Sequence, residues 1–187
     1  MAGWAVVTFD KSVDRAAHAL RLVRALSERG MSVAGFVQRR APGGELEAGR
    51  VTVCRVGRAD ELPLGRSGAN RAEGKEAMSS CSFAFRDDSF EHARRWLAQD
   101  APSAQVLVVG ELSKLEAEKK GHYAAARWAL LQPAKTVVLY ARADQLSYLI
   151  ERLEPEGEPI ADLVLPAGEP ETPRFLELLA AAVRPER

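Results

Sequence analysis

The feature that most constrains the fold of this sequence is a regular alternation of short apolar runs with amphipathic segments. Residues 3–9 (GWAVVTF) are an apolar run typical of a strand. Between residues 13 and 29, apolar side chains recur at helical spacing, and Gly30 follows where helices commonly end. Residues 31–38 (MSVAGFVQ) predict a second strand. Because a helix joins the two runs, we expect parallel strands with a right-handed crossover.

The same alternation returns in the second half of the chain. Residues 105–109 are fully apolar, which is typical of a strand buried on both faces. Two further strands are expected at residues 136–140 and 160–165. Helices are expected at residues 87–99, 121–131, 143–153 and 173–183. This order of elements predicts an open, mostly parallel sheet that helices cover on both sides.

The middle of the chain has a different pattern, which predicts additional β-structure. Residues 51–56 and 78–85 are expected to form antiparallel strands, with a mobile loop in the Gly- and Arg-rich stretch 65–76. The predicted fold class is therefore α/β, a three-layer sandwich with an antiparallel β insertion in the middle. We expect it to form a single domain over residues 1–187.

Charge and composition exclude several classes of function. The chain has 26 Lys plus Arg and 26 Asp plus Glu residues, so nothing in its overall charge favours nucleic acid or an anionic membrane as a partner. No apolar stretch approaches the roughly 18 residues of a membrane span, and the start lacks the features of a secretory signal. We therefore expect a cytoplasmic protein. Cys54, Cys81 and the three histidines lack metal-ligand spacing, so no metal site is predicted.

Ligands in such folds bind beyond the carboxyl ends of the strands, and residues 9–16 (FDKSVDRA) follow the first strand. A phosphate-binding P-loop at this place has the pattern GxxxxGK[ST], in which backbone N–H groups wrap a phosphate and the lysine reaches its outer oxygens. Here no glycine is present, Arg15 takes the place of the lysine, and Ala16 replaces the magnesium-binding hydroxyl. Asp10 and Asp14 add two carboxylates where phosphate charge would lie.

Two interpretations of this first segment stay open. It is either an ordinary helix start, capped by Ser12 or Asp10, or an altered anion site. In the second case Lys11 and Arg15 offset the acidic charge without restoring the backbone cradle.

Residues 110–121 follow the buried strand at 105–109 and form the second candidate segment. An apolar strand followed by acidic residues is typical of a Walker B motif, whose Asp holds magnesium and whose next Glu orients the attacking water. Gly110 takes the place of that Asp, whereas Glu111 is present. The charged cluster that follows is either a solvated loop with internal ion pairs or a loop that contacts a ligand or partner. Its members are Lys114, Glu116, Glu118, Lys119 and Lys120.

Taken in order, these segments resemble the small single-domain nucleoside-triphosphatase family of the P-loop superfamily over nearly the whole chain. The likeness is carried by 5-AVVTFDKS-12, by the helix end at 26–30 with 33-VAGFVQ-38, and by 107-LVVGELSKLE-116. In the last of these, Glu111 and Glu116 match the Walker B segment of the family.

A bacterial branch related to this family, without an assigned activity, is more similar still. It shares the glycine-poor first loop, the GxVQ pattern, a cysteine near Cys81 and the run 114-KLEAEKKG-121. The resemblance implies a P-loop-NTPase-like fold with a degenerate Walker A motif. The residues that carry hydrolysis in the triphosphatases are the ones missing here.

These observations favour a non-hydrolysing P-loop-like protein with a binding or regulatory role, because the loop glycines, the Walker A Lys and the Walker B Asp are all absent. We expect its contact surface at residues 10–15 and 111–120, and its ligand to be a small anion, a nucleotide or a protein partner. No cofactor is expected, and a homo-oligomer is compatible with the sequence. The predicted binding residues are Asp10, Lys11, Ser12, Asp14, Arg15, Lys114, Glu116 and Glu118.

Two alternatives remain. The first is an atypical nucleoside-triphosphate phosphohydrolase that takes a nucleotide with magnesium. In it, Lys11 and Arg15 bind the phosphates, and Glu111 is the catalytic residue that orients water. The second is a protein-interaction module that uses the loop at 65–76 or the terminal helix.

Overall fold

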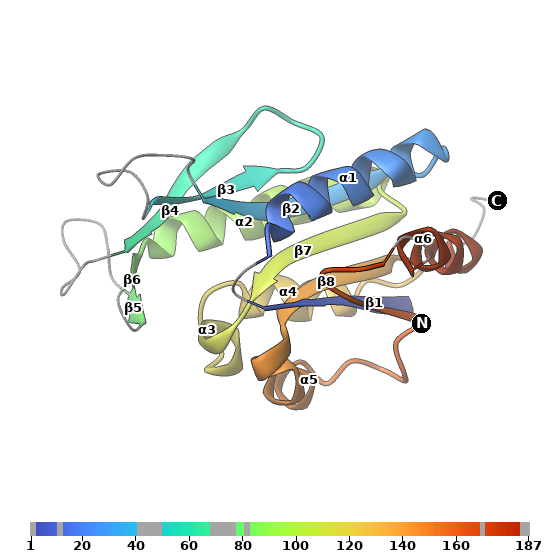
Figure 1. The fold of residues 1–187 in the computed structure, drawn as a ribbon. Helices are drawn as coiled ribbons and strands as arrows, with labels where there is room; N and C mark the ends of the chain where they lie inside the picture. The colour runs from blue at the N-terminus through green and yellow to red at the C-terminus, as the bar shows by residue number, and fades with distance from the viewer. Residues whose placement is uncertain are drawn as a thin grey trace.

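The apolar runs of the sequence pair into one continuous sheet, which a computed structural model describes for residues 3–10, 13–40, 50–67, 78–80, 83–168 and 171–183 (Figure 1). Within these residues the sheet has nine strands in the order β5-β6-β4-β3-β2-β7-β8-β1-β9. The strands are β1 (Gly3–Phe9), β2 (Val33–Arg40), β3 (Arg50–Arg55), β4 (Glu61–Ser67), β5 (Met78–Ser80), β6 (Phe83–Phe85), β7 (Val106–Leu112), β8 (Thr136–Arg142) and β9 (Ala161–Val164).

Helices join the parallel strands, as the alternation in the sequence predicts. The α-helices are α1 (Arg15–Glu28), α2 (Asp87–Asp100), α3 (Lys114–Ala117), α4 (Tyr123–Leu130), α5 (Leu146–Leu153) and α6 (Glu171–Ala182). Two 3₁₀ turns, η1 (Ala101–Ser103) and η2 (Ala143–Gln145), precede β7 and α5. Among the described residues, none of the helices combines the length and apolar character needed to cross a bilayer.

The sheet separates two apolar layers, which accounts for the fully apolar strands. On one face, α1 and α6 pack against alternate side chains of β1 such as Ala5 and Val7. On the other face, α2, α4 and α5 pack against the intervening side chains, such as Val6. Because both faces are covered, β7 and β8 need apolar residues at successive positions. The predicted three-layer α/β sandwich is thus confirmed.

The strands from β2 to β9 in the sheet order pair in parallel, and the middle of the sequence extends the sheet at one edge. There β2 pairs antiparallel with β3, and β3, β4, β6 and β5 follow in antiparallel pairs. The predicted antiparallel insertion is therefore confirmed.

The prediction for the insertion was wrong in two respects. It placed a loop over residues 65–76, whereas residues 65–67 belong to β4, a strand that the sequence analysis did not anticipate. It also expected one strand over residues 78–85, where β5 and β6 instead pair with each other antiparallel. Residues 68–77 and Cys81 lie outside the described residues, so the interaction role considered for this loop stays a prediction.

Candidate functional site

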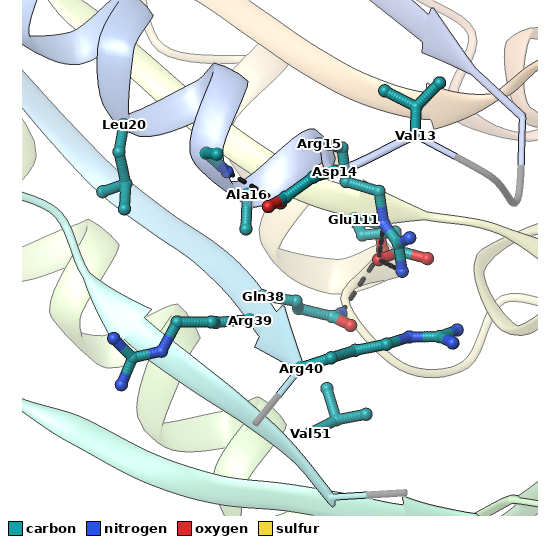
Figure 2. A pocket seen from close by; sticks show the side chains of 11 residues that line it. Val13, Asp14, Arg15, Ala16, Leu20, Gln38, Arg39, Arg40, Val51 and Glu111 are labelled. Carbon is teal, nitrogen blue, oxygen red and sulfur yellow. Dashed lines mark hydrogen bonds and ion pairs between the residues drawn. The ribbon is translucent and has the colours of Figure 1, made fainter. Parts of the chain in front are cut away.

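The carboxyl ends of β2 and β7 meet the start of α1 at one edge of the sheet, and a pocket of about 430 Å³ opens there (Figure 2). It is lined by the first turns of α1, by the last residues of β2, by Val51 on β3 and by Glu111 on β7. We call it the α1–β2 pocket. It lies where ligands bind in open α/β sheets.

Asp14 caps the helix that borders this pocket. Its Oδ1 accepts a hydrogen bond from the backbone N–H of Ala17 at 3.0 Å. The cap is therefore Asp14, and the expectation of Ser12 or Asp10 was wrong because the helix begins later, at Arg15. Ser12 lies outside the described residues, as does Lys11. The carboxylate of Asp14 satisfies one of the N–H groups that a phosphate would otherwise approach.

Arg15 and Glu111 form an ion pair inside the pocket. Nε and Nη2 of Arg15 both lie 2.5 Å from Oε2 of Glu111. The two side chains are only 12% and 14% exposed, and the guanidinium carbon of Arg15 lies 5.1 Å from the ring centroid of Phe9. The structure thus brings together the predicted phosphate-binding cation and the predicted water-orienting carboxylate.

The end of β2 contributes three polar side chains that the sequence analysis did not single out. Gln38 Nε2 donates a hydrogen bond to the backbone oxygen of Glu111 at 3.5 Å. In Figure 2, Arg40 extends below the Arg15–Glu111 pair, whereas Arg39 points the other way. Arg39 pairs with Glu61 at 2.7 Å near the surface. A signal for these residues was present, because Gln38 ends the predicted second strand and Arg39 and Arg40 directly follow it.

The charges in the pocket favour an anion. Arg15, Arg39 and Arg40 line it together with Asp14 and Glu111. Arg15 is paired with Glu111 and Arg39 with Glu61, so an anion would bind by replacing Glu111 on Arg15, at a helix start whose dipole also favours negative charge.

The exposed members of the charged cluster lie outside this pocket. Lys120 pairs with Glu118 at 3.1 Å, and Lys114 lies 4.0 Å from the same carboxylate. These pairs fit the solvated-loop interpretation. Asp10, which follows β1, is exposed and does not line the pocket either. A binding role for these residues stays a prediction.

Glu116 differs from its charged neighbours because it points inward and is only 1% exposed. Its Oε2 accepts from the backbone N–H of Ser113, and its Oε1 accepts from that of His122, each at 2.8 Å. Gly121 has a φ of +60°, and a Cβ there would lie 2.3 Å from Oε1 of Glu116. The carboxylate therefore ties the end of β7 to the start of α4, and only glycine fits beside it.

Burial dominates the ionisation of this cluster. It raises the pKa of Glu116 to about 7, against the opposing effect of the backbone N–H groups of His122, Ser113 and Glu116. It also lowers the pKa of His122 to about 3, so that the neutral ring packs between Phe36 and Phe90. Glu116 does not line the α1–β2 pocket, and its contacts hold the segment that follows β7.

The residues present do not fit a magnesium ion held by the protein. No group of three or more His, Cys, Asp or Glu side chains that could hold a metal occurs among the described residues. Gly110 and Ala16 stand where a P-loop protein has its metal-binding Asp and hydroxyl. A magnesium ion at this site would have to arrive with the phosphates of a nucleotide, as part of the substrate.

Comparison with solved structures supports the fold. The chain is similar to the solution structure of a human cancer-related nucleoside triphosphatase, with a TM-score of 0.70 and 18% identity over 100% of both chains. It is also similar to the crystal structure of THEP1 from the hyperthermophile Aquifex aeolicus, with a TM-score of 0.65 and 15% identity over 97% of this chain and 99% of that one. No protein-family model and no curated protein matches the sequence.

Proposed function

We propose that this protein binds a nucleoside triphosphate in the α1–β2 pocket and hydrolyses it. The observation that carries the proposal is the Arg15–Glu111 pair, because it places a phosphate-binding cation and a potential water-orienting carboxylate in one pocket. The full-length likeness to a solved nucleoside triphosphatase favours this function over the binding-only function that the sequence favours.

In this proposal the ligand displaces Glu111 from Arg15. Phosphate oxygens take the place of Glu111 on the guanidinium of Arg15, which can bind them in a bidentate fashion. Glu111 is then released beside the phosphate, where it orients a water molecule and accepts its proton. The water oxygen attacks the terminal phosphorus, the bond to the bridging oxygen breaks, and a nucleoside diphosphate and inorganic phosphate leave.

A second candidate is a protein that binds the nucleotide without hydrolysing it. It is favoured by Gly110 and Ala16, which offer no ligand to magnesium, and by Glu111, whose carboxylate is held by Arg15. In that case the pocket would serve a regulatory or storage role, and the Arg15–Glu111 pair would reform when the ligand leaves.

Phosphate release and binding, measured side by side, decide between the two. Release from ATP and GTP with magnesium should be lost in Glu111→Gln and kept in Glu118→Gln, an exposed carboxylate of the same segment. Binding measured by calorimetry should weaken in Arg15→Ala and persist in Arg24→Ala, which changes an exposed arginine of the same helix. Saturable binding without turnover establishes the second candidate. No binding at millimolar nucleotide rejects both.

A further inference from the structure

The part of β7 that carries Glu111 lies at an irregular point of the sheet. The register pairs of β7 with β2 end at Phe36 and Val109. On the other side, the pairing of β7 with β8 shifts between Val109 and Leu112. Glu111 falls inside this interval, so the regular ladders do not by themselves fix the direction of its side chain. Because such irregularities re-aim side chains, contacts beyond the ladders must hold Glu111 toward Arg15.

Two side chains hydrogen-bond to the backbone of residues 110–113 in the described part of the chain. Gln38 donates to the backbone oxygen of Glu111 at 3.5 Å, which is long for a hydrogen bond. Glu116 accepts from the backbone N–H of Ser113, two residues after Glu111, at 2.8 Å. The bond to Glu116 is the shorter, and it is charge-assisted when the carboxyl is ionised. Glu116 is therefore the stronger support of this segment.

The other oxygen of Glu116 anchors the same segment to the core. Its Oε1 accepts from the backbone N–H of His122, which precedes α4, and α4 is fixed by its buried residues Ala125, Ala126 and Ala129. The carboxylate thus bridges an irregular segment and a packed helix. Burying a carboxylate costs free energy that capping the single turn of α3 does not require, because an exposed Glu or Gln caps a helix as well.

Glu116 and Glu111 also lie within electrostatic reach of each other. Burial is the largest cause of the raised pKa of Glu116, and the charge of Glu111 raises that pKa further. A change at Glu116 therefore reaches Glu111 by two routes, through the backbone at Ser113 and through the charge.

We propose that Glu116 is the positioning residue for Glu111: by holding Ser113 against the start of α4, it directs the carboxylate of Glu111 toward Arg15. The inference rests on the proposed function for its effect on hydrolysis, whereas the positioning itself exists before any ligand binds. When the segment is released, Glu111 competes less with phosphate for Arg15 and orients water less well. Glu116 touches neither the phosphate nor the water.

Two variants release the segment in different ways. Glu116→Gln keeps the shape of the side chain but accepts at one oxygen only, so one of the two anchors is lost. Gly121→Ala keeps Glu116 and forces its carboxylate to move, because the new Cβ would lie 2.3 Å from Oε1. This second variant carries the test if the first does not fold.

Each variant has a matched control. Glu151→Gln changes an exposed glutamate on α5. Gly157→Ala imposes a backbone strain similar to that of Gly121→Ala, since φ is +70° at Gly157 and +60° at Gly121, but its Cβ would meet nothing within 4 Å.

The first measurement uses the protein without ligand. In protein with ¹⁵N-labelled arginine, the Nε–H resonance of Arg15 reports its hydrogen bond to Glu111, and Glu111→Gln gives the resonance of the broken pair. Glu116→Gln and Gly121→Ala should both move the Arg15 resonance toward that position. The two controls should leave it unchanged.

The second measurement is a double-mutant cycle with Glu111, read as the binding of inorganic tripolyphosphate by calorimetry. Glu116→Gln should tighten binding about threefold while Glu111 is present, and should change nothing in the Glu111→Gln background, because Glu116 acts through Glu111. In a phosphate-release assay, Glu116→Gln should lower kcat about tenfold without raising KM. A merely structural role would change the affinity equally in both backgrounds.

The outcomes separate this inference from the proposed function. An Arg15 resonance that stays unmoved in both variants overturns the positioning role, whether or not nucleotides are hydrolysed. Equal effects of Glu116→Gln with and without Glu111 overturn it too. A shifted resonance in a protein that binds no phosphate supports the positioning and rejects the proposed function. A shifted resonance with binding but no turnover supports the positioning and establishes the binding-only candidate.

Discussion

The Arg15–Glu111 pair decides what a ligand can do at this site, because each side chain satisfies the other in a place that water scarcely reaches. Both side chains are less than one-sixth exposed, so separating them leaves two poorly solvated charges. A ligand that replaces Glu111 on Arg15 must therefore carry negative charge of comparable density. Phosphate meets that requirement, and a neutral metabolite does not.

Replacing the Glu111 carboxylate should strengthen phosphate binding and abolish hydrolysis. Glu111→Gln frees Arg15 from its partner, so tripolyphosphate and nucleoside triphosphates should bind about tenfold more tightly, while phosphate release is lost. Calorimetry and a phosphate-release assay measure the two effects. Glu118→Gln serves as the control and should change neither. If Glu111→Gln weakens binding, Glu111 does not compete with phosphate for Arg15, and the exchange of partners is wrong.

Glu116 should make stability depend on pH in a direction that is unusual for a carboxylate. Its pKa rises from an ordinary value of 4.5 to about 7 in the folded protein. The folded state therefore holds the proton more tightly, so this contribution to stability is fully present below pH 4.5 and is lost as the pH rises through about 7. In Glu116→Gln this loss should be absent.

The free energy of unfolding measured with denaturant tests this prediction. From pH 5 to pH 8 the value for Glu116→Gln minus that for the wild type should rise by up to about 3 kcal/mol. The lowered pKa of His18 and His122 makes both proteins lose stability in acid, and these effects cancel in the difference. The same difference for Glu118→Gln should stay flat. A flat difference for Glu116→Gln would mean that the buried carboxyl titrates normally.

The sequence could not distinguish Glu116 from Glu118. Both are glutamates in the same charged run, two positions apart, and both were predicted to contact a ligand. Which of them turns inward depends on where β7 ends, and it ends at Leu112, after the strand predicted to end at 109. By contrast, Arg15 and Glu111 were predictable as neighbours, because both follow strands that end at the same edge of the sheet.

At the scale of elements, the pairing of β2 with β7 fixes how closely the two halves of the site approach. Gly35 on β2 faces Val108 on β7 in the register of the pair. Its φ is +133°, and a Cβ at this position would lie 1.9 Å from the carbonyl oxygen of Val108. Because the obstacle is backbone, no side chain can move aside to relieve it.

Gly35→Ala should therefore be among the most destabilising substitutions in the chain. We expect a loss of at least about 3 kcal/mol in the free energy of unfolding, since the two strands must move apart or β2 must change its backbone conformation. Gly3→Ala is the matched control, because a Cβ on that strand glycine meets its nearest atom at an ordinary 3.5 Å. Comparable stability of the two variants would contradict the close approach of β2 and β7.

Among the secondary-structure elements, those of the β insertion were predicted least completely from the sequence. The alternating strands and helices follow from apolar spacing and were predicted, whereas β4 was not. It contains Pro63 and Gly65, which usually interrupt strands, and its register with β3 shifts between Val51 and Thr52. Its buried Leu64 packs beneath α2, a tertiary contact that local sequence does not reveal.

For the whole molecule, the zero net charge conceals where the arginines lie. The net charge of zero predicted no preference for polyanions, but the sheet order gathers arginines of α1 and β2 at one edge. Composition sums over the surface and cannot report such an arrangement, which depends on β2 lying beside β7. The edge itself could be foreseen from the order of strands, and its charge only from the folded chain.

Zero net charge together with an arginine-lined pocket predicts how ligand and salt change the melting temperature. A phosphate ligand at about 100 times its dissociation constant should stabilise the protein by about 2.7 kcal/mol, which raises the melting temperature by several degrees. The increase should shrink as sodium chloride rises from about 0.05 to 0.5 M, since salt screens the arginines at the pocket. The melting temperature without ligand should change much less, because the charges of the chain are balanced.

Differential scanning fluorimetry with tripolyphosphate at several salt concentrations measures both effects in one experiment. Arg15→Ala should lose most of the increase, and Arg24→Ala should keep it, because Arg24 is exposed and lies away from the pocket. An increase that persists in Arg15→Ala would place the anion elsewhere on the molecule. An increase that is independent of salt would mean that the ligand is held by contacts other than charge, and the arginine-lined edge would not be its site.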